Sequence, residues 1–265
     1  MLRGLYAAAA GMITETNRTD VIANNLANAA TTGYKRDEAV NEQFAPMLLR
    51  RVDDKSNGDN PTSFRGFTVG DQAPVVGELG LGSYTEEIET DHQQGPMETT
   101  GNLLDMAISG NGYFVVQTPQ GARYTRDGSF YRRTDGALIN SQGYPVLDAN
   151  GQAIILPNTP NLTVGGRGEI WNGQNLIATL GVVEFNDRNA VLKEGSNLYR
   201  PQAGAQPQPA TGEVMQGVLE RSNVNVAKEM VDLIYNFRVY EAGSKAVVTQ
   251  DSLLDKAVND VGRVS

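Results

Sequence analysis

The chain has 265 residues, of which 40% are hydrophobic and 20% charged, so it holds enough apolar residues for one or two packed domains. Its formal net charge of −9 makes nucleic acid and anionic membranes poor partners, because their phosphate groups would repel it. The absence of cysteine excludes disulfides, thiolate metal sites and a cysteine nucleophile, and without an apolar run of about 18 residues we expect no transmembrane helix.

Residues 1–34 have the periodicity of a helix. Apolar and small residues recur at alternating steps of three and four, as along one helix face: Leu2, Leu5, Ala9, Met12, Thr16, Thr19, Ala23 and Leu26. Gly33 is a plausible stop for this helix. The first residues faintly resemble a signal peptide, but the helical period continues through the polar residues that follow. We therefore expect this segment to remain in the mature protein, without a cleaved signal peptide.

The middle of the chain changes character twice. Residues 35–72 have no period, and after an apolar group at Phe44 to Leu49 they become polar, which predicts an extended arm. Residues 73–200 carry closely spaced turn dipeptides, which supply the positive φ angles of tight hairpins: Asp127-Gly128, Asp135-Gly136, Gln142-Gly143 and Asn150-Gly151. The short strands expected between such turns are 112–117, 129–133, 137–140, 152–156, 162–164, 169–171, 176–184 and 191–193.

The end of the chain returns to helix after a linker at 201–211, which is rich in Pro, Gln and Ala. In segment 212–265, Asn225 stands where a helix N-cap is expected, with Glu229 in the first turn. A stripe then recurs at steps of four and three: Val226, Met230, Leu233, Phe237, Tyr240, Ser244, Val247, Asp251, Leu254, Val258 and Val261. Such a stripe needs a cover, which the N-terminal helix or another copy of the chain could supply.

These segments predict an α+β chain. Its N- and C-terminal helices would pair as a coiled-coil-like stalk, and a mostly antiparallel β domain would be inserted between them. The C-terminal stripe is longer than the N-terminal one, so we expect part of it to contact other subunits; a purely intramolecular core remains the alternative. The stripe positions expected to join subunits are Leu2, Leu5, Met12, Leu26, Met230, Leu233, Phe237, Tyr240, Val247 and Leu254.

Enzyme chemistry has little support in the sequence. His92 is the only histidine, and no second histidine or cysteine exists to complete a common metal or nucleophile site. Acidic residues such as Asp105, Glu169 and Asp187 form no recognisable catalytic pair. We expect no enzyme activity, no cofactor and no small-molecule substrate. A secreted β-rich adhesin and a carbohydrate-acting enzyme stay open as functions of another class.

Three groups of motifs stand out, at the beginning, in the middle and at the end of the chain. The N-terminal group is Asn24-Asn25-Leu26-Ala27-Asn28 with Thr32-Gly33-Tyr34-Lys35-Arg36. The central group is Leu104-Asp105-Met106-Ala107-Ile108, Gly112-Tyr113-Phe114-Val115-Val116, Tyr124-Thr125-Arg126-Asp127-Gly128-Ser129-Phe130 and Gly143-Tyr144-Pro145-Val146-Leu147. The C-terminal group is Ser222-Asn223-Val224-Asn225-Val226, Glu229-Met230-Val231, Tyr240-Glu241 and Ser244-Lys245-Ala246. Together these motifs resemble the bacterial flagellar rod and hook proteins, and most closely the rod proteins of the basal body.

The resemblance implies a structural subunit of the flagellar basal-body rod, proximal or distal, that polymerises axially through its terminal helices and transmits torque between motor and hook. It implies export across the inner membrane by the flagellar type III apparatus. The partners would be copies of itself and neighbouring rod and hook proteins. Phe44 and Leu48 match an export-recognition element of such substrates, although an ordinary apolar packing group is the alternative. A hook or hook-associated subunit is the second interpretation within the family.

Overall fold

The computed structural model describes residues 2–50, 63–64, 67–68, 75–159, 161–187 and 190–261. The chain divides into two compact units. The helical unit comprises Met1–Val21, Ala39–Ile88 and Val231–Ser265, and the β unit comprises Ile22–Glu38 and Glu89–Met230. Among the described residues, no helix is long and apolar enough to cross a membrane.

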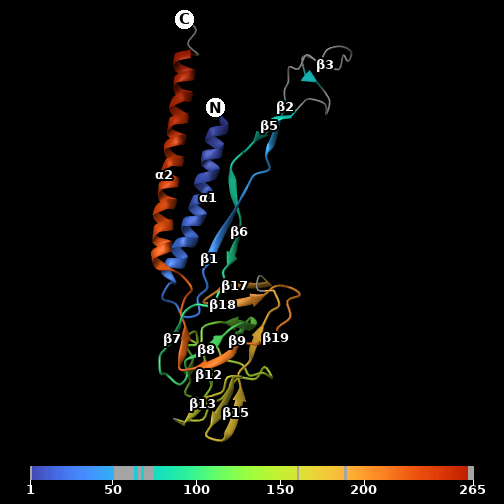
Figure 1. Ribbon diagram of the computed structural model, residues 1–265, viewed down its shortest axis with the longest axis vertical. Coiled ribbons are helices and arrows are strands. Elements are labelled where there is room, and N and C mark those ends of the chain that lie inside the picture. Colours follow the sequence, from blue (N-terminus) through green and yellow to red (C-terminus); the bar gives the residue numbers. More distant parts are fainter. Residues whose placement is uncertain are drawn as a thin grey trace. The chain divides into compact units, whose positions relative to one another are not determined.

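The two terminal helices are α1 (Leu2–Ala27) and α2 (Val226–Lys256), and a π-helical turn, Ala257–Val261, follows α2. In the helical unit they lie side by side and run antiparallel (Figure 1), so that Thr19 contacts Asn236 while Gly4 approaches Gln250. Both predicted helices are confirmed. The predicted N-cap is also present, because the side-chain oxygen of Asn225 accepts a hydrogen bond of 3.1 Å from the backbone N–H of Lys228.

Paired strands occupy the described part of the expected arm. β1 (Asp37–Gln43) pairs with β6 (Ser83–Thr90), β2 (Met47–Arg50) is antiparallel to β5 (Val75–Leu79), and the short β3 (Ser63–Phe64) is antiparallel to β4 (Phe67–Thr68). Residues 51–62, 65–66 and 69–74 lie outside the described part of the chain. In the helical unit, α1 is tied to β6 by the Thr14 hydroxyl, which donates a 3.1 Å hydrogen bond to the Ser83 carbonyl.

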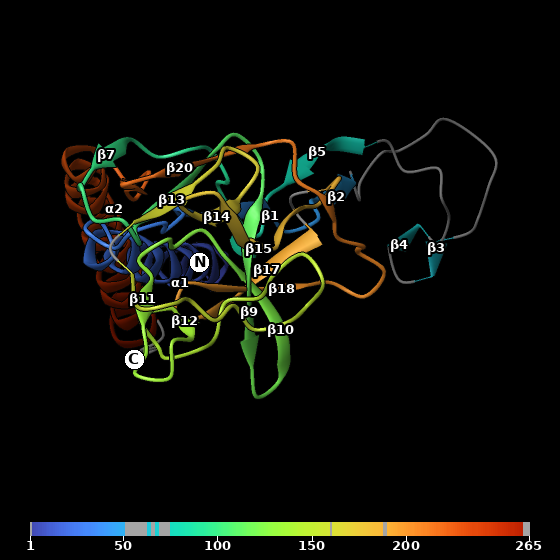
Figure 2. The ribbon, with the colours of Figure 1, turned by 90° about the horizontal axis from the view of Figure 1, so that it is seen from below.

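The β unit is mostly antiparallel, as predicted. Its main sheet has the order β17-β18-β10-β9-β16-β19, and β9 and β10 form a hairpin (Figure 2). The strands of this sheet are β9 (Tyr113–Thr118), β10 (Gly121–Thr125), β16 (Val182–Glu184), β17 (Val191–Gly195), β18 (Leu198–Pro201) and β19 (Gln208–Pro209).

Smaller sheets complete this unit. One has the order β13-β14-β15, and the pairs β11-β12, β8-β20 and β7-β21 are separate ribbons. Their bounds are β7 (Met97–Thr99), β8 (Met106–Ser109), β11 (Tyr131–Arg132), β12 (Leu138–Ile139), β13 (Leu162–Val164), β14 (Glu169–Asn172), β15 (Asn175–Thr179), β20 (Glu213–Gln216) and β21 (Val218–Glu220).

Several boundaries differ from the sequence expectation. The expected strand 152–156 makes only isolated bridges, through Ala153 and Ile155. The expected linker 201–211 contains β19, which lies at the edge of the main sheet, where a proline is tolerated because an edge strand leaves one row of N–H groups unpaired. Of the segment 212–265, the part before Val226 forms β20 and β21 rather than helix.

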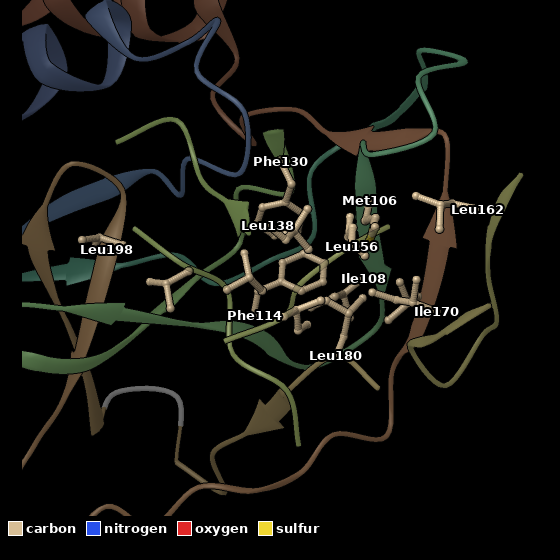
Figure 3. Close-up of a cluster of buried hydrophobic side chains, with 14 residues drawn as sticks. Met106, Ile108, Phe114, Phe130, Leu138, Leu156, Leu162, Ile170, Leu180 and Leu198 are labelled. Carbon is tan, nitrogen blue, oxygen red and sulfur yellow. The ribbon is translucent and has the colours of Figure 1, made fainter. Parts of the chain in front are cut away.

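The core of the β unit is a cluster of fourteen buried side chains, among which Phe114 and Phe130 pack edge to face with ring centroids 5.1 Å apart (Figure 3). Fully burying a side chain of this size contributes about 1.5–3 kcal/mol. The members of the cluster are Met106, Ile108, Phe114, Val116, Phe130, Leu138, Val146, Ile154, Leu156, Leu162, Ile170, Leu180, Leu198 and Val214.

The turn glycines behave in two ways. Gly136, Gly143 and Gly151 have the positive φ predicted for hairpin turns, at 90°, 86° and 78°. Gly128 does not have a positive φ; it permits close packing instead, because a Cβ there would lie 1.5 Å from the Met106 carbonyl oxygen. The prediction of a positive φ at Asp127-Gly128 was therefore wrong.

Candidate assembly surface and its anchoring cluster

The three groups of motifs meet in the β unit around one buried carboxylate. Glu220 and Lys35 are each 1% exposed, and Lys35 Nζ lies 2.5 Å from Glu220 Oε1. Arg126 Nη1 lies 3.3 Å from the other carboxylate oxygen, and the backbone N–H of Gly95 donates to Oε1 at 2.9 Å. The Glu220 carbonyl also accepts a hydrogen bond from the N–H of Gly33. Segments from the beginning, middle and end of the chain thus depend on one residue.

Asn25 holds the end of α1 against the chain that follows it. Its side-chain Nδ2 donates to the Asp37 carbonyl at 2.8 Å, and its Oδ1 accepts from the Asp37 N–H at 2.9 Å. The Tyr34 hydroxyl donates to the same Oδ1 at 3.2 Å. Lys193 closes the group, with Nζ 2.8 Å from Asp37 Oδ2 and 4.1 Å from the centre of the Tyr34 ring. The asparagine-rich motif therefore works as a clamp on the backbone.

The C-terminal motif contacts the same region. Asn223 accepts a 2.7 Å hydrogen bond from the backbone N–H of Arg36 and donates to the Asp91 carbonyl at 2.9 Å. The Arg36 guanidinium lies 3.4 Å from Glu229, a buried residue in the first turn of α2. These contacts join the end of the N-terminal motif group to the beginning of the C-terminal motif group within the β unit.

Burial controls the electrostatics of this anchoring cluster, which we define as Lys35, Arg126, Glu220, Asn25 and Tyr34. Burial lowers the pKa of Lys35, and the neighbouring Glu220 carboxylate opposes this shift. Burial also raises the pKa of Tyr34, with the charges of Asp37 and Glu229 adding to the effect. Because the protein itself supplies partners to the Glu220 carboxylate and the Lys35 ammonium, the cluster is built to join segments rather than to react with a ligand.

Two cavities and the single histidine are further candidate binding features of the β unit. A cavity of about 410 Å³ beside the cluster is lined by polar side chains, including Asn28, Gln142 and Asn197, and a second one of about 720 Å³ borders β16 and β19. His92 Nδ1 lies 2.9 Å from the Tyr113 hydroxyl. Within the described residues, no three His, Cys, Asp or Glu side chains are grouped as metal ligands.

The stripe residues expected to join subunits fall into two sets. Leu5, Met12, Leu26, Leu233, Val247 and Leu254 are partly buried within the chain. Met230, Phe237 and Tyr240 are exposed, with Phe237 at 56%. Leu2 is the first residue of α1, and its side chain lies outside the described residues.

Sequence reasoning missed other exposed apolar residues on α2, namely Val231, Ile234 and Tyr235. It also missed that the buried face of α2 includes Asn236 and Gly243 beside the partly buried Leu233, Val247 and Leu254 of the stripe. The signal for this face was a seven-residue repeat of Asn236, Gly243 and Gln250, which a search for apolar residues passes over.

Phe44 lies in the connection between β1 and β2, Leu48 lies in β2, and both side chains are exposed. The Phe44 ring lies 5.1 Å from the ring of Tyr84, so its one aromatic neighbour among the described residues comes from β6. Neither side chain belongs to a buried cluster of the described residues, which leaves them accessible.

Comparison with known proteins gives a consistent family. Residues 5–35 match a family model described as flagella basal body rod protein, residues 107–172 match the flagellar hook protein FlgE/F/G D1 domain, and residues 215–260 match the flagellar basal body rod FlgEFG protein C-terminal model. The flagellar basal-body rod protein FlgG of Bacillus subtilis (strain 168) is 34% identical over 98% of this chain and 99% of its own length.

Two further relatives align with this chain over the full length of both proteins. The flagellar basal-body rod protein FlgF of Caulobacter vibrioides is 35% identical over 100% of each chain. The flagellar hook-basal body complex protein FlhO of Bacillus subtilis (strain 168) is 29% identical, also over 100% of each chain.

Proposed function

Because the chain belongs to the flagellar basal-body rod protein family, we propose that it polymerises axially through its two terminal helices. It is a structural subunit of the bacterial flagellar basal-body rod. Within each subunit, α1 and α2 would pair as a coiled-coil-like stalk. The exposed side of these helices would contact copies of the chain and neighbouring rod and hook proteins.

The observation that supports this mechanism is the exposed apolar surface of α2 in the helical unit. Val231, Ile234, Tyr235, Phe237 and Tyr240 are 40–65% exposed within two turns or so of one another. Val231, Ile234, Tyr235 and Phe237 lie within about half of the helix circumference, and we call these four residues the outer face of α2. Covering an apolar side chain of this size contributes about 1.5–3 kcal/mol, so leaving five of them in water favours association.

Repetition of one such contact leads to a filament. If the outer face of α2 meets a different surface of the next copy, the contact is head-to-tail and does not close, so it repeats as an open helical assembly. The partly buried positions Leu5, Met12, Leu26, Leu233, Val247 and Leu254 would then hold the stalk together, while Met230, Phe237 and Tyr240 join neighbours. Leu2 belongs to the same proposed stalk surface. Such a rod would carry torque from the motor to the hook.

The ordering of the stalk would accompany assembly. Fixing the backbone costs about 1–2 kcal/mol per residue, which nearly offsets the burial that two helices achieve alone. We therefore expect the helical unit to be less stable in the free subunit than the β unit. The chain would reach the rod by flagellar type III export, without a cleaved signal peptide. Phe44 and Leu48 would form the exposed element that the export apparatus recognises. We propose no enzyme activity and no cofactor for the chain.

The test is a charge on the outer face of α2. Phe237→Asp should abolish rod assembly and motility because it places a carboxylate in an apolar contact, whereas the matched Phe237→Leu keeps an apolar side chain and should retain both. The β unit should fold normally in both variants, as judged by the fluorescence of Trp171, the only tryptophan. Normal motility of the Phe237→Asp strain would contradict the proposal.

Export has its own test. Phe44→Ala should reduce the amount of chain secreted through the flagellar apparatus, and Met47→Ala, which changes an exposed apolar neighbour in β2, should not. Equal secretion of both variants would remove Phe44 from the proposed export element without affecting the assembly proposal.

A further inference from the structure

Asn236 is a polar residue at the centre of an apolar helix contact. Its side chain is 0% exposed. Its Nδ2 donates hydrogen bonds to the Glu15 carbonyl at 2.7 Å and to the Thr19 hydroxyl at 2.8 Å, both on α1 in the helical unit. Its Oδ1 has no hydrogen-bond partner among the described residues. The hydrogen bonds of such a buried amide form only when its acceptors stand at the right places on the neighbouring helix, and losing them costs free energy.

The contacts around Asn236 repeat every seven residues along α2. Seven residues on, a Cβ at Gly243 would lie 3.0 Å from Met12 Cγ; after another seven, Gln250 Nε2 would lie 3.0 Å from a Cβ at Gly4. We call Asn236, Gly243 and Gln250 the inner column of α2. Its partners on α1 also step by about one heptad and run in the opposite direction, as in an antiparallel helix pair.

The aliphatic contacts of α2 cannot by themselves fix this register. The partly buried Leu233, Val247 and Leu254 belong to one heptad series with Tyr240, so a slip of one heptad puts another apolar side chain, aliphatic or the Tyr240 ring, in the place of each. Burial of aliphatic area is not directional and would change little on such a slip. The inner column does distinguish the registers, because its residues are an amide, a glycine and an amide, and a slip of one heptad puts an amide where the glycine was.

A slipped register would cost the Asn236 amide one of its two hydrogen bonds. If Gly243 moved to the place of Gln250, Asn236 would take the place of Gly243, beside the Ala8 carbonyl and the Met12 side chain. The Ala8 carbonyl stands where the Glu15 carbonyl is now, but the Met12 thioether would replace the Thr19 hydroxyl and is a much weaker acceptor. Thr19 itself would stay satisfied by its bond to the Glu15 carbonyl, so the loss would fall on Asn236.

From this asymmetry we propose that Asn236 is the positioning residue that sets the register of α2 against α1. The inference rests on the pairing of the terminal helices in the proposed function and adds which residue determines it. A fixed register holds the free ends of both helices at a defined offset, which every subunit of a regular assembly must share.

Cysteine cross-linking measures the register directly, because the chain has no cysteine of its own. The pair Met12→Cys with Gly243→Cys reports the native register, since the two Cβ atoms would lie within disulfide range. The pairs Gly4→Cys with Gly243→Cys, and Met12→Cys with Gln250→Cys, report slips of one heptad in opposite directions. Oxidised purified chain is analysed under denaturing conditions, where intrachain disulfides keep the monomer mass.

With Asn236 present we expect the native pair to cross-link and both slipped pairs to stay near background. Asn236→Leu should raise cross-linking of the slipped pairs about fivefold, which corresponds to the net contribution of one hydrogen bond. Thr19→Val removes the acceptor that only the native register offers and should raise it as well. The matched control is Gln250→Leu, assayed with the two cysteine pairs that retain position 250; it removes an amide from the same column whose Oε1 has no partner and should leave the register unchanged.

The outcomes separate this inference from the proposed pairing. If Asn236→Leu leaves the slipped pairs at background while the native pair cross-links, packing alone sets the register and the role of Asn236 is refuted. If the native pair fails to cross-link with Asn236 in place, the helix pairing itself is wrong, and the inference falls with it. An increase with Gln250→Leu equal to that with Asn236→Leu would also overturn a specific role for Asn236.

Discussion

Lys35 and Glu220 stand 185 residues apart in the sequence and form a buried ion pair of 2.5 Å in the β unit. Arg126 shares the same carboxylate. Taking charged groups out of water is costly, and the arrangement is tolerable because each charge has a partner. Removing the Glu220 carboxylate leaves the buried Lys35 and Arg126 without a counter-ion, whereas removing Lys35 leaves the carboxylate paired to Arg126.

We therefore predict that Glu220→Ala destabilises the β unit by about 3–5 kcal/mol, and that Lys35→Met costs clearly less. Urea unfolding followed by Trp171 fluorescence measures both, since Trp171 lies in β14 of this unit. The matched control is Glu98→Ala, whose partner Arg221 is about half exposed; loss of such a surface pair should cost about 0–1 kcal/mol. Equal costs for Glu220→Ala and Glu98→Ala would refute the bracing role of the cluster.

Two adjacent asparagines in the N-terminal motif should respond differently to the same change. Asn25 is buried and makes three hydrogen bonds to Asp37 and Tyr34, while Asn24 is exposed. Asn25→Ala should lower the free energy of unfolding of the β unit by about 1–3 kcal/mol because it strands the Asp37 backbone groups. Asn24→Ala should change it by less than about 0.5 kcal/mol, and similar urea midpoints for the two variants would contradict the clamp.

Local sequence rules predicted the elements that local physics controls. Helix periods gave both terminal helices, Asn225 was identified as a cap because its side chain satisfies a free N–H, and Gly136, Gly143 and Gly151 adopt the positive φ of turns. The family resemblance identified the motif residues, although it did not say what they contact. The ion pair between Lys35 and Glu220 could not be predicted, since nothing local links residues so far apart.

Part of the predicted stripe of α2 lies one residue away from the buried positions, because hydrophobicity is a poor guide in this helix, although Leu233, Val247 and Leu254 are partly buried as the stripe predicts. Phe237 is apolar and exposed, while the adjacent Asn236 is polar and fully buried. Apolar periodicity indicates which face leaves water, but not whether the cover comes from the same chain or another. In a subunit that carries apolar residues on an outer face, the two faces are easily exchanged.

Two buried tyrosines should show opposite effects of losing a hydroxyl. The Tyr199 hydroxyl is buried and has no hydrogen-bond partner among the described residues, so Tyr199→Phe should leave stability unchanged or raise it by about 1 kcal/mol. The Tyr34 hydroxyl donates to Asn25, so Tyr34→Phe should lower stability by about 1 kcal/mol. Urea unfolding midpoints of the β unit measure both changes in stability. A loss of stability for Tyr199→Phe as large as that for Tyr34→Phe would mean that the Tyr199 hydroxyl has a hydrogen-bond partner.

The β unit should lose stability above about pH 10. Burial raises the pKa of Tyr34 and of Tyr199 above the ordinary value of 10.0, so the unfolded chain releases these protons first as the pH rises. The unfolded state then binds fewer protons than the folded state, and the free energy of unfolding falls with pH. Lys35 acts with the opposite sign below its ordinary value of 10.5, because burial lowers its pKa and the unfolded chain holds that proton longer.

Tyrosinate absorbance tests this prediction directly. Of the ten tyrosines, Tyr34 and Tyr199 should ionise only as the β unit unfolds, together with the change in Trp171 fluorescence. In denaturant all ten should titrate together. Lys35→Met should remove the gain in stability expected just below pH 10.5 without shifting the loss above it. Reversible ionisation of all ten tyrosines in the folded protein would show that neither hydroxyl is protected by burial.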